Sequence, residues 1–297
     1  MHPGTASQKT RPTFTLKLHD RDLELGYRTL IMGILNVTPD SFSDGGAFFD
    51  HAQAVAQAVR MSEEGADIID IGGESTRPGA ESVKLDEEIR RVVPLVKILS
   101  KEVSVPISVD TYKSEVAAQS LDAGAHMIND ISGLRFDPAM AGLAARYKTP
   151  VVVMHIKGTP KDMQQNPTYT DLIGEISAYL EEGVRKAEHA GLKRDQVVVD
   201  VGIGFGKTLS HNLELIRRLD EFHAMGCPML IGPSRKSFIG KILDLPVQER
   251  LEGTAAAVTM AISRGVHIVR VHDCAPIKRV VQVSDAIMDP HAFDETI

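Results

Sequence analysis

Eight short apolar runs in the sequence end in residues that could bind or polarise a small molecule. The first run starts at Leu30 and the last at Ile268, so successive runs begin about 34 residues apart. Nearly every end is polar or ionisable. These ends are Asn36, Gly73 and Glu74, Asp110, Asn129 and Asp130, His155, Asp200, Ser234 to Lys236, and Arg270 to His272. This recurrence predicts one shared site rather than eight unrelated positions.

The polar residues at these ends, and in the loop after the second run, form two chemical groups. Carboxylates, an amide and an ammonium match the amino, ring N–H and carbonyl edges of a flat heterocycle. This heterocycle group is Asp110, Asn129, Asp200 and Lys236. Donors and cations match a phosphate or diphosphate. This anion group is Asn36, Thr76, Arg77, Arg270 and His272. The residues alone equally allow Asp and Lys to pair in structural salt bridges.

The apolar runs predict an α/β fold, a (β/α)8 TIM barrel. They are continuous and rich in Val and Ile, which is typical of parallel strands buried on both faces, and amphipathic stretches with helical spacing separate them. We expect strands at residues 30–36, 67–73, 106–110, 127–131, 150–155, 197–202, 228–232 and 268–272. We expect Asp86 and Ser210 to cap two of the helices. In such barrels the catalytic groups lie at the carboxyl ends of the strands.

The chain is expected to form a single domain around this barrel. Residues 1–27 would be an N-terminal arm and barrel-floor segment, residues 28–290 the barrel, and residues 291–297 a C-terminal tail. Within the arm, Phe14, Leu16 and Leu18 alternate as in a strand. The connections at 37–49 and 74–84 are long and rich in Gly, Pro, Ser and Asp, which is typical of mobile lids over a site.

Charge and composition favour a small-molecule partner. The net charge is -7 and no block of Lys or Arg stands out, which argues against nucleic acid and anionic membranes as partners. No stretch approaches the roughly 20 apolar residues that cross a bilayer, and no signal-peptide core precedes Arg11, so we expect a cytoplasmic protein. Cys227 and Cys274 lie in no spaced ligand group. Cys274 is therefore expected to be a packed residue rather than a thiol or metal site beside His272.

Two familiar motifs are incomplete in this sequence. Residues 202–208 resemble a Walker A loop, but that pattern needs a glycine where Val201 stands, and the glycine spacing of dinucleotide folds is absent. The first run ends at Asn36 without a pair of histidines, so a zinc hydrolase barrel would lack its first two ligands. An ATPase, a dehydrogenase and a zinc hydrolase are therefore disfavoured.

Six motifs run in order from the first expected strand to the eighth. They are residues 34–46 (ILNVTPDSFSDGG), 70–79 (DIGGESTRPG), 108–111 (SVDT), 129–131 (NDI), 234–237 (SRKS) and 270–273 (RVHD). Together they resemble the dihydropteroate synthases, a pterin-binding family of folate biosynthesis. The sequence departs from the family's usual pattern at Val201, Ile156 and Cys274, and none of these changes removes a functional group.

The resemblance implies a transferase that joins 6-hydroxymethyl-7,8-dihydropterin diphosphate to 4-aminobenzoate and releases diphosphate. It implies that the heterocycle group holds the pterin and that the anion group holds the diphosphate, with magnesium (Mg2+) near Asn36. Catalytic roles would belong to Asp110, Asp200, Lys236, Arg270 and His272. The arylamine pocket would be bordered by Phe42, Pro78 and Ser237. A homodimer and a sulfonamide target are implied as well.

Two other functions are considered beside this one. A pterin-binding barrel that transfers a methyl group from methyltetrahydrofolate would keep the heterocycle group but would need no diphosphate clamp. A non-catalytic pterin carrier would need neither the complete set of side chains nor two long loops. Formation of 7,8-dihydropteroate from the two substrates would distinguish the three.

Overall fold

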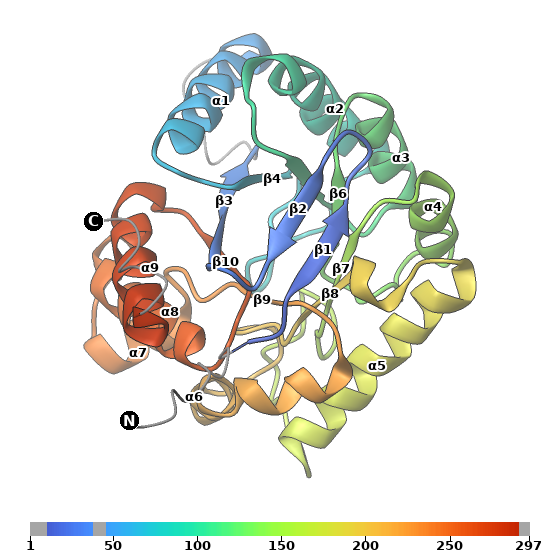
Figure 1. The fold of residues 1–297 in the computed structure, drawn as a ribbon. Helices are drawn as coiled ribbons and strands as arrows, with labels where there is room; N and C mark the ends of the chain where they lie inside the picture. Colours follow the sequence, from blue (N-terminus) through green and yellow to red (C-terminus); the bar gives the residue numbers. More distant parts are fainter. Residues whose placement is uncertain (1–10, 38–45, 291–297) are drawn as a thin grey trace, which may run out of the picture.

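Eight parallel strands close into a barrel, which confirms the expected (β/α)8 fold (Figure 1). The computed structural model describes residues 11–37 and 46–290, with the backbone alone for residues 46–50. The strands pair in the order β10-β3-β4-β5-β6-β7-β8-β9. They are β3 (Leu30–Asn36), β4 (Ile68–Gly72), β5 (Ile107–Asp110), β6 (Met127–Asp130), β7 (Val151–Met154), β8 (Val197–Asp200), β9 (Met229–Ile231) and β10 (Ile268–Val271). All eight fall within the ranges expected from the sequence.

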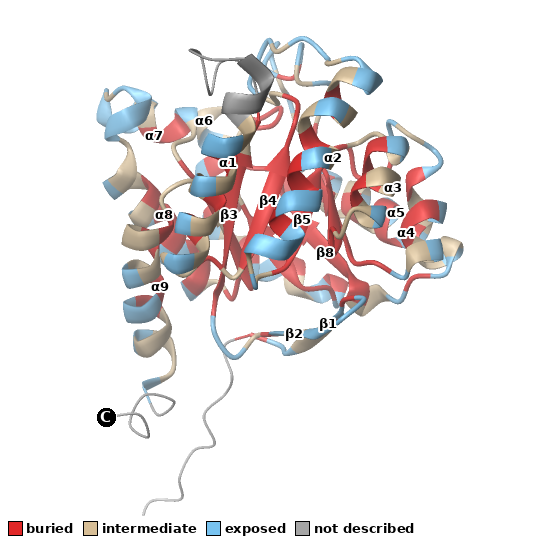
Figure 2. Ribbon diagram, turned by 90° about the horizontal axis from the view of Figure 1, so that it is seen from above, coloured by how far each residue is buried: buried red, intermediate tan, exposed pale blue. Residues whose placement is uncertain are grey.

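Helices surround the barrel and cover the outer face of the strands (Figures 1 and 2). They are α1 (Gly46–Glu63), α2 (Leu85–Glu102), α3 (Ser114–Asp122), α4 (Met140–Tyr147), α5 (Leu172–Ala190), α6 (Leu209–Arg217), α7 (Ser237–Leu243), α8 (Leu251–Ser263) and α9 (Cys274–Met288). In the described part of the chain, 3-10 helices also lie between them: η2 (Arg194–Gln196), η3 (Leu219–Met225) and η4 (Val247–Glu249). Within the described residues, no helix has both the length and the apolar character needed to cross a membrane.

Both expected helix caps are wrong by two positions. Helix α2 follows Lys84, which makes no side-chain capping bond, and Asp86 lies inside its first turn. Helix α6 follows Thr208, whose hydroxyl accepts a hydrogen bond from the backbone N–H of His211. The His211 side chain completes this capping box, so Ser210 is left within the helix.

The two faces of each strand belong to two different cores. Outward-facing residues such as Ile69 and Val199 pack with the helices in the larger core. Inward-facing residues form a smaller core at the bottom of the barrel: Leu30, Met32, Ile68, Met127, Val152, Val198, Leu230 and Ile268. Because side chains alternate along a strand, residues two positions after these also point into the barrel, one layer closer to the carboxyl ends.

A β-hairpin covers the bottom of the barrel (Figure 2). It consists of β1 (Phe14–Lys17) and β2 (Asp22–Leu25), and Leu16 and Leu25 are buried in the smaller core. Two buried histidines lie beside it. His126 Nδ1 accepts from the N–H of Ile107 at 3.1 Å, and His267 Nδ1 accepts from the N–H of Met229 at 3.0 Å. Burial lowers the pKa of both rings to about 4, so both are neutral at neutral pH.

The start of the described chain is tied to the last helix at this same end of the barrel. The guanidinium of Arg11 donates to the Thr29 hydroxyl at 2.6 Å and to the Val266 carbonyl at 2.8 Å. It also lies 3.0 Å from the Asp285 carboxylate on α9. Asp285 accepts from the Thr29 N–H at 2.7 Å as well, so one buried network joins the first described residues, β3 and α9.

Candidate active site

On four strands the inward-facing residue of the upper barrel layer is polar, whereas the residue below it is apolar. Two positions after Ile68, Met127, Val198 and Ile268 of the smaller core come Asp70, Asn129, Asp200 and Arg270. The strand pairing sets Gly72 beside Asp110 and Asp110 beside Asn129. The structure therefore brings Asp110, Asn129, Asp200 and Arg270 together at one end of the barrel, as the sequence predicted.

Arg270 bridges two buried carboxylates across the barrel. Its Nε lies 2.6 Å from Asp70 Oδ2, and its Nη2 lies 2.7 Å from Asp110 Oδ2. The Asn129 amide donates to Asp70 Oδ2 at 2.9 Å, while Asp70 Oδ1 is buried without a hydrogen-bond partner within the described chain. Burial raises the pKa of Asp110, and the guanidinium of Arg270 opposes that rise. Asp70 was not expected in the site because it lies inside an apolar run of the sequence.

Asp200 and Lys236 face the same space with perturbed pKa values. Burial raises the pKa of Asp200 to about 6, although its Oδ1 accepts from the N–H of Gly202 at 2.7 Å. Burial lowers the pKa of Lys236 to about 8, and its ammonium lies 4.1 Å from the centre of the Phe205 ring. Both groups are thus poorly solvated in the free protein. Such groups are typical of ligand-binding sites.

The loop after β8 is built around Lys207, a buried residue to which the sequence pattern assigned no role of its own. Lys207 Nζ lies 2.8 Å from His155 Nδ1 and donates to the Phe205 carbonyl at 2.9 Å, and burial lowers its pKa. Gly202 has a φ of +69°, and a Cβ there would lie 1.9 Å from the His155 carbonyl oxygen. Only glycine fits so close an approach. The loop therefore holds Phe205 next to Lys236.

His272 is a neutral donor in this arrangement rather than a cation. Its Nδ1 lies 2.9 Å from the Ser234 hydroxyl, which itself accepts from the His272 N–H at 3.2 Å. We assign the hydroxyl proton to Nδ1, which leaves the imidazole proton on Nε2. Burial lowers the pKa of His272 to about 4, so this neutral form predominates at pH 7. An Nε2–H group remains a donor suited to an anion.

The segment before α7 is held in a strained turn. Arg235 has a φ of +55°, in the left-handed region. Its guanidinium pairs with Asp273 at 2.5 Å, and its N–H donates to the Thr254 hydroxyl at 3.0 Å. These contacts fix the backbone that carries Lys236. Ser237, the next residue, is exposed at the first turn of α7.

Other expected site residues lie at the rim or elsewhere. Asn36 and Thr76 are partly buried, and Arg77 and Pro78 are exposed in the loop after β4. Phe42 lies outside the described residues, as does most of the expected lid at 37–49. Asp130 points away from the barrel interior and accepts from the N–H groups of Ser132 and Leu134 at 2.7 and 3.1 Å, so it stabilises a loop.

Two oxygen ligands suitable for a hard cation border one position at the barrel mouth. A Cβ on Gly72 would lie 3.7 Å from Asn36 Oδ1 and 3.6 Å from Asp110 Oδ2. An amide oxygen and a carboxylate oxygen are ligands that Mg2+ accepts, with water and substrate oxygens completing the shell. Because Asp110 Oδ2 also accepts from Arg270 at 2.7 Å, Asn36 Oδ1 would be the main protein ligand of a loosely held magnesium ion.

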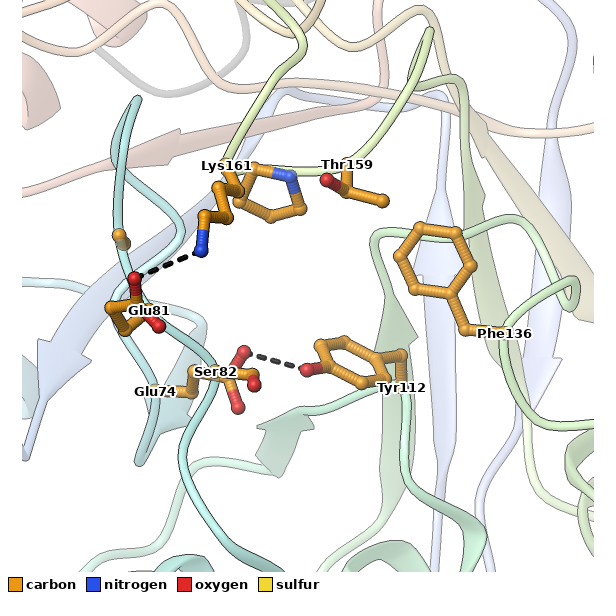
Figure 3. Close-up of a pocket in the computed structure, with 9 residues that line it drawn as sticks. Glu74, Glu81, Ser82, Tyr112, Phe136, Thr159 and Lys161 are labelled. Carbon is orange, nitrogen blue, oxygen red and sulfur yellow. Dashed lines mark hydrogen bonds and ion pairs between the residues drawn. The ribbon is translucent and has the colours of Figure 1, made fainter.

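A cavity of about 360 Å³ opens beside the strand-end cluster, not within it (Figure 3). The loop after β4 supplies Glu74 and Glu81, the loop after β7 supplies Lys161, and Tyr112 and Phe136 provide ring faces. None of the heterocycle or anion groups lines it. The residues to which the sequence assigns chemistry therefore lie at the barrel mouth, and the cavity lies behind one of its loops.

Comparison with known proteins agrees with this geometry. A family model described as pterin binding enzyme matches residues 32–272. A dihydropteroate synthase of Synechocystis sp. is 51% identical over 263 residues, which covers 88% of this chain and 91% of that protein.

Solved structures give the same result. The Xanthomonas albilineans dihydropteroate synthase with 4-aminobenzoic acid superposes with a TM-score of 0.87 at 41% identity, covering 94% of this chain and 99% of that chain. The Yersinia pestis enzyme in complex with a sulfonamide drug gives a TM-score of 0.86 at 43% identity, covering 92% and 98%. From its barrel, its strand-end residues and these matches, the chain belongs to the dihydropteroate synthases of the pterin-binding enzyme family.

Proposed function

We propose that this enzyme condenses 6-hydroxymethyl-7,8-dihydropterin diphosphate with 4-aminobenzoate at the carboxyl ends of the barrel strands. The observation that carries the proposal is the convergence of Asp110, Asn129, Asp200 and Arg270 in the upper layer of the barrel interior, above an apolar floor. The products are 7,8-dihydropteroate and diphosphate.

The heterocycle group binds the pterin. The Asp200 and Asp110 carboxylates accept hydrogen bonds from the ring N–H and amino groups. The Asn129 amide and the Lys236 ammonium donate to the carbonyl oxygen and the ring nitrogens. Asp110 and Asp200 are both almost fully buried, so each carboxylate gains hydrogen bonds from the ligand that water does not supply in the free site. Phe205 offers a ring face next to Lys236.

The anion group stabilises the leaving diphosphate. The bond between the pterin methylene carbon and the bridging oxygen breaks, and the oxygen keeps the electron pair. The guanidinium groups of Arg270 and Arg77, the Thr76 hydroxyl and the Nε2–H of His272 donate to the developing charge. The amine nitrogen of 4-aminobenzoate then bonds to the methylene and loses one proton. Because diphosphate is already an activated leaving group, no covalent nucleophile is required of the protein.

Magnesium is part of this proposal. Asn36, with Asp110 beside it, would hold the ion, which supplies positive charge to the diphosphate oxygens when bound. The arylamine would enter between Pro78, Ser237 and Phe42, of which Ser237 and Pro78 are exposed to solvent at the rim. The solved relatives that hold 4-aminobenzoic acid and a sulfonamide drug support a similar pocket here.

A homodimer in the cytoplasm completes the proposal. Met260 on α8 is 46% exposed, and Val283 and Ile287 on the neighbouring α9 are 62% and 69% exposed. Apolar side chains exposed together on adjacent helices support a contact between copies of the chain. Sedimentation analysis should give a dimer for the wild type and a monomer for Val283→Glu. A wild-type monomer at micromolar concentration would contradict the dimer.

A diphosphate-release assay tests the proposed reaction. Diphosphate and 7,8-dihydropteroate should form in equal amounts, and only when 4-aminobenzoate and the pterin diphosphate are both present. The Asp200→Asn variant serves as the control, because product formation that depends on pterin binding should fall when this carboxylate is replaced. Transfer of a methyl group from methyltetrahydrofolate, or pterin binding with no product at all, would instead support one of the alternative functions.

A further inference from the structure

We propose that Glu74 is a positioning residue that fixes the loop after β4, residues 73–84, so that Thr76 and Arg77 can meet the substrate diphosphate. This inference rests on the proposed function, which places both residues on the diphosphate. It concerns a carboxylate that none of the roles above uses.

The Glu74 carboxylate joins both ends of its loop to the barrel. Its Oε1 accepts from the Tyr112 hydroxyl at 2.7 Å. Its Oε2 accepts from the N–H of Val83 at 3.0 Å and lies 2.5 Å from Lys113 Nζ. The side chain is 7% exposed. One buried carboxylate therefore binds the far end of the loop and the loop after β5 at the same time.

The same contacts connect this loop to the pterin side of the site. Asp110 ends β5, and Thr111, Tyr112 and Lys113 follow it in that order. Lys113 also pairs with Glu88 of α2, whose Oε1 accepts from the Thr111 hydroxyl at 2.7 Å. Glu88 is 1% exposed. The strand end that carries Asp110 and the loop that carries Arg77 thus share one buried ionic network.

The first residue of the loop leaves no room for displacement. A Cβ on Gly73 would lie 2.6 Å from Val92 Cγ2 and 3.1 Å from Glu88 Cγ, so the backbone rests directly on α2. Arg91 Nη1 donates to the Gly73 carbonyl at 2.9 Å. Gly73 is thus fixed on α2 and Val83 is fixed by Glu74, so both ends of the segment that carries Thr76 and Arg77 are anchored.

The outer side of the loop is held by weaker contacts. The N–H of Gly79 donates to the Pro160 carbonyl at 3.0 Å, and Glu81 pairs with Lys161 at 3.0 Å. The Glu81 and Lys161 side chains are 81% and 69% exposed, and ion pairs this exposed contribute little. Figure 3 shows the Glu74–Tyr112 and Glu81–Lys161 contacts at the wall of one cavity. Two glutamates of one loop thus form a buried and an exposed contact.

The test compares Glu74→Ala with Glu81→Ala. For Glu74→Ala we expect kcat/KM for the pterin diphosphate to fall at least tenfold, because a misplaced Arg77 no longer meets the leaving group. The Kd of a pterin without phosphates, measured by calorimetry, should stay within twofold. Glu81→Ala should leave both quantities within twofold. Glu74→Gln should recover part of the loss, since an amide oxygen can still accept from Tyr112.

The alternatives give different results. Equal losses of affinity for the pterin and for the pterin diphosphate in Glu74→Ala would show a general structural role and overturn the proposal, as would unchanged kcat/KM. If Glu74→Ala does not fold, Tyr112→Phe decides the question: we expect a threefold to tenfold rise in KM for the diphosphate substrate, and no change overturns the proposal. Wild-type protein without product formation would refute the proposed function instead.

Discussion

Replacing Asp200 with asparagine should stabilise the free enzyme while it weakens pterin binding. Burial raises the pKa of Asp200 to about 6 from the ordinary 3.8, so the folded protein holds this proton more tightly than the unfolded chain does. The free energy of unfolding therefore falls as pH rises from about 4 to about 6. Above that range, the ionised Asp200 destabilises the fold by about 3 kcal/mol, at roughly 1.4 kcal/mol per pH unit.

Asparagine removes this cost and keeps an oxygen that can accept from the N–H of Gly202. Denaturant titration at pH 7 should therefore give Asp200→Asn a free energy of unfolding higher than the wild type by up to about 3 kcal/mol, and by roughly half as much at pH 5. Calorimetry with a pterin should show a loss of about 1.5 to 3 kcal/mol in binding free energy.

The pH dependence is what separates this reasoning from ordinary mutational damage. A variant that is less stable than the wild type at pH 7 would refute it. So would a stability difference that is the same at pH 5 and pH 7, because the effect would not come from ionisation of this carboxylate. Unchanged pterin affinity in a folded variant would remove Asp200 from the pterin site.

Three further outcomes are expected. Arg270→Ala leaves Asp70 and Asp110 buried without their cation and should lower the free energy of unfolding by about 3 kcal/mol or more, measured by denaturant titration; a smaller loss would mean that water replaces the guanidinium. Because burial lowers the pKa of Lys236 to about 8, pterin affinity should fall as pH rises through 8. The Lys236→Gln variant should show no such fall, and an identical fall in the variant would assign the pH dependence to another group. Enzyme with magnesium but without 4-aminobenzoate should exchange oxygen isotope between bridging and non-bridging positions of the substrate diphosphate, and Arg77→Ala should slow this exchange about 100-fold or more; an undiminished rate in the variant would exclude Arg77 from bond breaking.

The barrel could be predicted from the sequence because its strands leave a strong pattern. Strands buried on both faces are continuous apolar runs, and the first of them, β3, has the expected bounds to the residue. The first residues of the helices were harder to predict from the sequence. At α6 the capping hydroxyl belongs to Thr208 rather than to Ser210, and only the positions of the backbone N–H groups decide between two such neighbours.

The candidate site could be predicted where a polar residue ends a strand, and not where it lies inside one. Asp110 and Asp200 were found by position, whereas Asp70 was hidden between Ile69 and Ile71. An inward polar residue flanked by outward apolar ones could have revealed it. The pairing of Arg270 with Asp70 joins residues 200 positions apart, and spacing along the chain gives no sign of it.

The network of Arg11, Thr29 and Asp285 determines where this enzyme can be joined to other proteins. It holds both ends of the described chain against the side of the barrel that the hairpin closes, away from the strand ends that carry Asp200 and Arg270. A fusion partner attached next to either end of the described chain would therefore lie on the hairpin side of the barrel and would not block the strand ends where substrate enters. Arg11 and Asp285, near the two ends of the described chain, form an ion pair at 3.0 Å, so the barrel is suited to circular permutation with new termini in a surface loop.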